Sequence, residues 1–270
     1  MAGIDIPDNW MGKPIDGALE RVLAKKQTPV VPAPIVSPVT ANIINPRTYL
    51  KVPQYGNTLI ATEETHRGKD MYETLQALKA EGLVMPSPRL FMTHWINVKQ
   101  AAVNKLNALV YADGTTVPDT EAERLWAYLS STDRKPFGNK PAWSWLNARF
   151  TEENGKWYMQ NDLQVVTDST GKKKLEGIIK DLDCPIREDC YVDLEFNAQG
   201  FPIRESTNQQ YEQGNNSRFW HPRNEAVAGF NAGSVWAGLN CNGDPTNRNS
   251  SLGVFACAAG GAPQNSGGSP

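Results

Sequence analysis

The chain has 270 residues, a formal net charge of −2 and a hydrophobic content of 40%. This length allows one large domain or two small ones, and the hydrophobic content is sufficient for a sizeable core. The near-neutral charge argues against a general nucleic-acid binder and against a protein that binds anionic membranes, because both need a basic face.

No apolar stretch approaches the roughly 20 residues that a membrane-spanning helix requires, so we expect no membrane insertion. The first residues, MAGIDIPDNWMGKPIDG, lack a basic start followed by an apolar run. We therefore expect no signal peptide. These observations leave the localisation open, and exposure outside a cell would need another route, such as incorporation into a virus particle.

Residues 1–47 are predicted to form a proline-rich N-terminal arm. Proline removes backbone donors and favours extended chain. One short helix is expected near Ile15–Lys26, where apolar residues fall on one face. Such an arm can be disordered, can pack along its own domain, or can join subunits into a homo-oligomer. The prolines that mark it are Pro29, Pro32, Pro34, Pro38 and Pro46.

The globular pattern begins at Tyr49. Residues Tyr49–Val52 and Thr58–Ile60 are typical of strands. A helix is then expected, because Asp70 can cap it with Glu73 three residues later, and Gly82 can end it. Its apolar face is predicted to consist of Met71, Leu75 and Leu78.

The next elements are less regular. Leu90–Val98 is rich in β-branched and aromatic residues and is interpreted as a strand or a buried segment. Asp113 and Gly114 predict a turn. A second helix is expected from Thr120, with Glu123 completing a capping box.

Beyond this point the helical period disappears. Trp143–Phe150 is expected in the core, and Lys156–Val166 and Tyr191–Phe196 alternate as strands do. Asn197–Pro202 is expected to be a loop. The basic run Lys172–Lys174 is interpreted as a solvated hairpin turn, in preference to a phosphate site.

This order, two helices followed by strands with long irregular connections, predicts an α+β fold rather than a doubly wound sheet. We expect one domain over residues 48–258, preceded by the arm over 1–47 and followed by a flexible tail over 259–270.

The residues that usually carry catalysis form no recognisable site. His66, His94 and His221 are scattered and build no metal-binding spacing with carboxylates. Glycine-rich phosphate loops and nucleophile-elbow motifs are absent from the sequence. We therefore predict no catalytic residue, no metal and no cofactor, and expect that the protein is not an enzyme.

Four cysteines leave two interpretations open. Cys184 and Cys190 bracket a short loop and could form a disulfide, whereas Cys241 and Cys257 lie on apolar segments. No zinc-binding spacing is present. The alternative is that all four are buried free thiols.

The most informative segment is residues 219–258, which contains six asparagines, no lysine and only four charged residues. Its stretch Val235–Asn242 alternates as a half-buried strand does. One set of side chains is small or apolar and is expected to point inward, namely Ala237, Leu239 and Cys241. The other set is expected to point outward, namely Trp236, Gly238, Asn240 and Asn242.

An outward tryptophan beside outward asparagines is typical of a recognition surface, because aromatic rings give contact area at low entropic cost and amides give adaptable hydrogen bonds. A polar loop follows over residues 242–251, and Leu252–Cys257 is expected to return as a strand that closes the domain. The alternative is a polar hairpin without a partner.

The same segment resembles the variable region of proteins diversified by retroelements, which are phage and archaeal-virus target proteins with a C-type lectin fold. The likeness covers most of the chain from about Leu90 and is specific only near the C-terminus. It is carried there by Trp220-His221-Pro222, Phe230, Ala237-Gly238-Leu239, Pro245, Asn247 and Ser251-Leu252-Gly253-Val254.

The resemblance implies a variable region over about residues 219–258 with a fixed frame and replaceable surface positions. The implied frame is Phe230, Ala237, Leu239, Pro245, Leu252 and Val254. The implied ligand-binding positions are Trp220, Asn224, Asn231, Val235, Trp236, Asn240, Asn242, Asp244, Thr246, Arg248 and Asn249.

The resemblance thus implies a protein that binds an unidentified protein or cell-surface ligand. Two alternatives remain. The chain could be a structural virion or tail-fibre protein that assembles through its arm. It could also be related to formylglycine-generating enzymes, which share the fold. That chemistry would need Cys241 and Cys257 close together and accessible to solvent.

Overall fold

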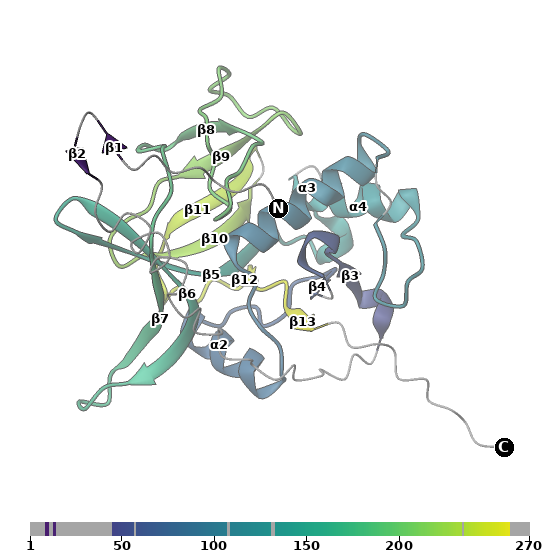
Figure 1. The fold of residues 1–270 in the computed structure, drawn as a ribbon. Helices are drawn as coiled ribbons and strands as arrows, with labels where there is room; N and C mark the ends of the chain where they lie inside the picture. Colours follow the sequence, from purple (N-terminus) through teal and green to yellow (C-terminus); the bar gives the residue numbers. More distant parts are fainter. Residues whose placement is uncertain are drawn as a thin grey trace. The chain divides into compact units, whose positions relative to one another are not determined.

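The structure of the protein is a computed structural model (Figure 1). The chain divides into two compact units, residues 1–37 and 38–270. In the first unit, β1 (Asn9–Trp10) pairs antiparallel with β2 (Lys13–Pro14). The helix expected near Ile15–Lys26 lies outside the described residues. The structure describes residues 9–10, 13–14, 45–56, 58–106, 109–130, 133–233 and 235–259.

The second unit begins with the two predicted strands, β3 (Tyr49–Lys51) and β4 (Thr58–Ala61), which pair antiparallel. On its other side, β4 pairs with β13 (Cys257–Ala259). The expectation that the chain returns near Cys257 and closes the domain is therefore confirmed. The single strand expected over Leu252–Cys257 is wrong in detail, because β12 (Leu252–Gly253) pairs with a different sheet.

The first predicted helix is confirmed as α2 (Met71–Ala80). The Glu73 backbone N–H donates to Asp70 Oδ1 at 2.8 Å, and the Asp70 N–H donates to Glu73 Oε2 at 3.4 Å. This reciprocal capping box satisfies two backbone donors that the helix start would otherwise leave unpaired. Met71 and Leu78 are buried, as their spacing predicts.

The segment Leu90–Val98 is buried as expected, but it is not a strand. It lies in helix α3 (Pro88–Ala102). Ser87 Oγ accepts a hydrogen bond from the Leu90 N–H at 3.2 Å, and Pro88 occupies the first turn, where proline is favoured. Packing at helical spacing outweighs the β propensity of this segment. The residues buried along it include Leu90, Phe91, His94, Trp95, Val98, Ala101 and Ala102.

The helix expected from Thr120 is confirmed as α4 (Asp119–Leu129), but its predicted capping box is wrong. Pro118 is the N-cap residue and makes no side-chain cap. Glu123 instead accepts a hydrogen bond from Lys105 Nζ at 2.6 Å. The described part of the chain therefore contains three α-helices rather than the two expected, because α3 occupies the segment for which a strand or a buried segment was expected.

The main sheet contains eight strands in the order β7-β6-β5-β10-β11-β9-β8, with β12 beside β5. The β9/β11 and β5/β12 pairs are parallel and the others are antiparallel. The predicted α+β class is confirmed. The strands not yet given bounds are β5 (Ala142–Glu153), β6 (Lys156–Thr167), β7 (Lys173–Asp181), β8 (Cys190–Asp193), β9 (Asn216–Trp220), β10 (Val227–Ala232) and β11 (Ala237–Gly243).

The sheet is packed on both faces. Helices α3 and α4 lie beside one another near β5 and β10 (Figure 1), and the ring of Phe91 lies 4.8 Å from that of Phe230 on β10. On the opposite face, α2 and the segment after β11 pack against Trp145 of β5. Trp145 Nε1 donates to the Lys69 carbonyl at 3.2 Å. The central strands thus form a frame fixed from two sides.

A buried polar cluster joins this frame to the loop between β11 and β12. The Glu64 carboxylate is fully buried, and its Oε2 accepts hydrogen bonds from Arg67 Nη2 at 2.6 Å and from the Tyr128 hydroxyl at 2.5 Å. Arg67 Nη1 donates to the Ser251 carbonyl at 3.1 Å. Burial raises the pKa of Glu64 to about 8, although Arg67 opposes this shift.

We expect the free energy of unfolding to fall by at least about 1 kcal/mol as the pH rises from 5 to 8. The folded state retains the Glu64 proton up to about pH 8, whereas the unfolded chain releases it near pH 4.5. The contribution of the Glu64 proton to stability is complete below the unfolded pKa of 4.5 and is lost as the pH rises through the folded pKa of about 8. Urea denaturation across this range measures it. Glu64→Gln removes the titrating group, so an unchanged pH dependence in this variant would contradict the assignment.

Candidate functional site

The parallel pairing of β9 with β11 builds the centre of the candidate site. Asn240 of β11 lies opposite Trp220 of β9 in the register. The alternate residues of these strands point into the core, where Phe219 and Cys241 are fully buried and Leu239 is 1% exposed. The inward set predicted from alternation is therefore confirmed.

Two half-buried tryptophans lie at the end of β9 (Trp220) and immediately before β11 (Trp236). The rings of Trp220 and Trp236 meet edge to face, with centroids 4.9 Å apart and an interplanar angle of 79°. Trp236 also packs against Gly233, where a Cβ would come within 2.6 Å of the indole. Gly233 therefore makes room for the ring, and the tryptophan pair has a defined position.

Arg218 and Tyr191 belong to the same surface and were not predicted. The Arg218 guanidinium lies 5.1 Å from the centroid of the Tyr191 ring and 5.7 Å from that of Trp220. In the part of the chain that the structure describes, Arg218 has no ion pair. The sequence holds one signal for it, since Arg218 lies two residues before Trp220 and so shares its face of the strand.

We call this group, Tyr191, Arg218, Trp220, Trp236 and Asn240, the aromatic patch. Its residues come from β8, β9, β11 and the residue before β11. Tyr, Trp and Arg are the residue types that most often dominate binding energy in protein interfaces. A guanidinium over aromatic rings also offers a charge that a partner's acidic group can pair with.

Gly238 is the one member of the predicted outward set that is buried. It lies opposite Arg218 in the parallel register. A Cβ at position 238 would lie 1.7 Å from the Arg218 carbonyl oxygen. Gly238 therefore belongs to the frame, because the backbone of β9 occupies the space that a side chain at position 238 would need.

Four further predicted positions lie around or beyond the patch. Asn231 of β10 is half-buried opposite Gly238, and Val235 is 66% exposed beside Trp236. The Asn242 N–H donates to Asn240 Oδ1 at 2.8 Å. Asn224 lies in the turn before β10, and its Oδ1 accepts a hydrogen bond from the Glu152 N–H at 2.9 Å.

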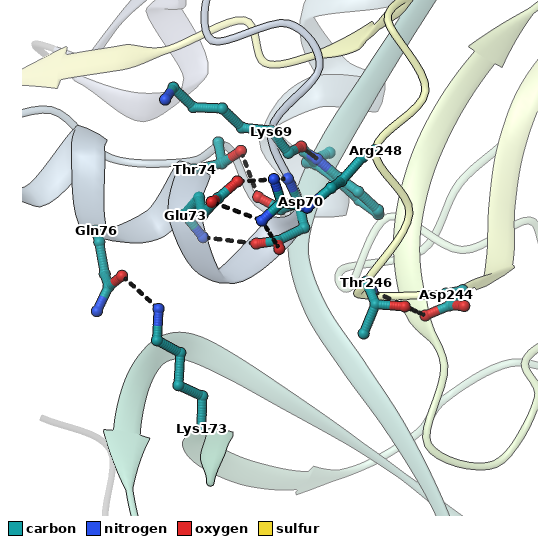
Figure 2. A network of polar contacts seen from close by, with 10 residues as sticks. Lys69, Asp70, Glu73, Thr74, Gln76, Lys173, Asp244, Thr246 and Arg248 are labelled. Atoms are coloured by element: carbon teal, nitrogen blue, oxygen red, sulfur yellow. Dashed lines mark hydrogen bonds and ion pairs between the residues drawn. The ribbon is translucent and has the colours of Figure 1, made fainter. Parts of the chain in front are cut away.

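The remaining predicted positions lie in the loop after β11, near α2. Arg248 Nη2 donates to Asp70 Oδ2 at 3.0 Å and to Glu73 Oε1 at 2.6 Å (Figure 2). These are the two carboxylates of the α2 capping box. Arg248, predicted to point outward, is thus partly engaged within the protein, and it fastens the loop to the helix start.

The other polar side chains of this loop shape its backbone. Asp244 Oδ1 accepts hydrogen bonds from the Thr246 N–H and hydroxyl, both at 2.8 Å (Figure 2). Asn249 Oδ1 accepts one from the Ser251 N–H at 2.9 Å. Such bonds stabilise turns and leave the opposite side of each residue exposed to solvent. The predicted positions therefore fall into two groups, one around the aromatic patch and one beside α2.

The cysteines do not meet the requirement of the enzyme alternative. Cys241 and Cys257 are both 0% exposed, whereas that chemistry needs accessible thiols. Burial raises the pKa of both thiols above the usual value. Cys184 and Cys190, the pair for which a disulfide was considered, are free and buried. Within the described residues, no cluster of three or more metal-binding side chains is present.

No protein-family model, curated protein or solved structure matches the chain. None of the helices in the described part combines the length and hydrophobicity that a bilayer-spanning helix needs.

Proposed function

We propose that the protein is a ligand-binding protein of the retroelement-diversified class with a C-type lectin fold, and that the aromatic patch is the centre of its binding surface. One observation carries the proposal. The half-exposed pair Trp220 and Trp236 lies directly beside strand positions that are almost fully buried. Side chains on this face can change while the residues that hold the strands remain the same.

The physical basis is the separation of binding from folding. Core substitutions cost several kcal/mol, whereas substitutions at surface positions usually change stability by less than about 0.5 kcal/mol. The surface positions Asn231, Val235 and Asn240 flank the tryptophans. A protein or cell-surface ligand of matching shape would bury the rings, and the flanking side chains would set specificity.

The assembly role is a separate proposal. Attachment to a virion or tail fibre through residues 1–47 is compatible with ligand binding by the domain over residues 48–258. Only β1, β2 and residues 45–47 of this arm are described.

A selection experiment tests the recognition function. A library randomises Asn231, Val235, Asn240 and Asn242, retains both tryptophans, and is selected for binding to lysozyme as a model target. We expect folded binders with dissociation constants of about 1 μM or tighter. A control library randomises four exposed positions of the turn 169–172. Equal recovery of binders from both libraries, or loss of folding in the first, would refute a specialised surface.

Diversification itself is tested at the nucleotide level. Retroelement mutagenesis acts at adenines, and both asparagine codons begin with two adenines, so Asn231, Asn240 and Asn242 are positions at which it could act. A near-copy of the coding segment and a reverse transcriptase gene are expected nearby. Absence of both would leave a ligand-binding surface without a retroelement.

A further inference from the structure

Strand β7 (Lys173–Asp181) is the last strand at one side of the main sheet. It pairs with β6, and no strand of the described residues pairs with its other edge. An edge strand exposes backbone donors and acceptors that can pair with another strand. This edge is nine residues long, longer than the strand β8 at the opposite side.

The middle of β7 is apolar on both faces of the sheet. Ile178 is 53% exposed and Ile179 is 62% exposed, and neighbouring residues in a strand point to opposite faces. Edges are usually protected by proline, a bulge or charged side chains, lysine above all. The lysines of β7, namely Lys173, Lys174 and Lys180, lie toward its two ends and leave Gly177 and Ile178 between them uncharged. The strand has no proline, and the irregularity of the β6/β7 pair lies between Asn161 and Gln164 of β6.

Charged residues lie on either side of this apolar centre. Glu176 and Lys180 are exposed and point to the same face of the sheet as Ile178. In the described part of the chain, neither of these two side chains forms an ion pair. They have opposite charges and are equally spaced from Ile178, so the edge is complementary to a second copy of itself.

We propose that two copies of this chain pair through β7, antiparallel about a two-fold axis at Ile178. In this register Ile178 faces Ile178 of the second copy, and Glu176 faces Lys180 of the second copy twice. Directly opposed side chains of opposite charge stabilise an antiparallel pair. A symmetric dimer of this kind uses the same surface on both subunits.

The neighbouring registers are less favourable. A two-fold axis at Gly177 would place Lys173 opposite Asp181 of the second copy, but it would also place Lys174 opposite Lys180, so favourable and unfavourable pairs offset one another. An axis at Glu176 would place this residue opposite itself. Both arrangements oppose like charges, which destabilises a strand pair. With an axis at Ile179, no acidic residue of the strand would face a lysine of the second copy. The charges therefore select the register centred on Ile178.

The other face of the strand accommodates the second isoleucine. In the selected register, Ile179 of the second copy lies opposite Gly177, which has no side chain. Leu175, Gly177 and Ile179 line one side of a hollow of about 710 Å³, whose other lining residues include the charged Arg149 and Glu225. The exposed Ile179 of each copy would pack over Gly177 of the other at the edge of this hollow and lose part of its contact with water.

Pairing of a single edge strand buries less surface than the roughly 1,200–2,000 Å² of a standard stable interface. We therefore expect a weak dimer with a dissociation constant on the order of 10 μM. The proposal is independent of the ligand-binding function, because no residue of β7 belongs to the aromatic patch.

Sedimentation equilibrium of the full chain, at concentrations from about 1 to 200 μM, tests the proposal. Wild-type protein should dimerise as its concentration rises. Ile178→Lys and Glu176→Lys should each raise the dissociation constant at least tenfold, and Glu176→Lys combined with Lys180→Glu should restore pairing. Ile203→Lys is the matched control, because Ile203 is 46% exposed but lies outside the sheet edge.

Circular dichroism verifies that each variant is folded, and the charge-exchanged double variant reports on pairing even where a single variant is unstable. A wild-type protein that remains monomeric throughout the range would overturn the proposal. So would a dimer that Ile178→Lys and Glu176→Lys both leave unchanged, because the contact between the two copies would then lie outside β7.

Discussion

Replacing Gly238 with alanine is expected to lower the free energy of unfolding by about 3 kcal/mol or more. The added Cβ would lie 1.7 Å from the Arg218 carbonyl oxygen and 2.6 Å from its carbonyl carbon. These contacts are with backbone atoms, so no side-chain rotation can relieve them. The strands β9 and β11 would have to separate at the centre of the candidate site. Urea denaturation monitored by tryptophan fluorescence measures the change.

Asn242→Ala is the matched control for this substitution. Asn242 lies on the same strand and is half-buried, but it already carries a Cβ, so alanine adds no atom at this position. We expect its effect on unfolding to be below about 1 kcal/mol. If Gly238→Ala were as mild as the control, β9 and β11 would not be in the close parallel pairing described, and the frame assignment of Gly238 would fail.

Replacing Trp236 with alanine is expected to weaken ligand binding about 30-fold or more, which corresponds to about 2 kcal/mol. The substitution removes one ring of the tryptophan pair and leaves Trp220 without its edge-to-face neighbour. The measurement is calorimetric titration of lysozyme into a selected clone that retains both tryptophans.

Trp157→Ala separates lost binding from lost stability. Trp157 is also half-buried, but it lies on β6 and packs against His221. We expect this variant to lose stability and to keep its affinity for the ligand. If Trp236→Ala instead lowered the melting temperature sharply and left affinity intact, the ring would serve the core, and the patch would lose its central residue.

Local rules predicted the parts of the fold that depend on near neighbours in sequence. The capping box of α2 requires only Asp70 and Glu73, three residues apart, and it is confirmed. The alternation of β11 likewise predicted which residues face the core. In contrast, the composition of Leu90–Val98 predicts a strand or a buried segment and correctly indicates its burial, but its aromatic and β-branched residues hide the three- and four-residue spacing of the buried side chains of α3.

The candidate site was predictable only in part, since its geometry depends on pairing between distant strands. Sequence alternation identified Trp236 and Asn240 as surface residues but could not show that β9 runs parallel beside β11. That pairing brings Arg218 and Tyr191 to the tryptophans and buries Gly238. The ion pairs of Arg248 with α2 also join residues far apart in the chain.

The two ends of the segment 219–258 belong to different sheets. It begins in β9 of the main sheet and ends in β13, which pairs with β4 of the three-stranded sheet. Neither end can shift its register without breaking hydrogen bonds to a strand elsewhere in the chain, β8 for β9 and β4 for β13. We therefore expect a substitution at an exposed position around the aromatic patch, such as Val235, to change what the segment contacts and to leave the pairing of its two ends in place.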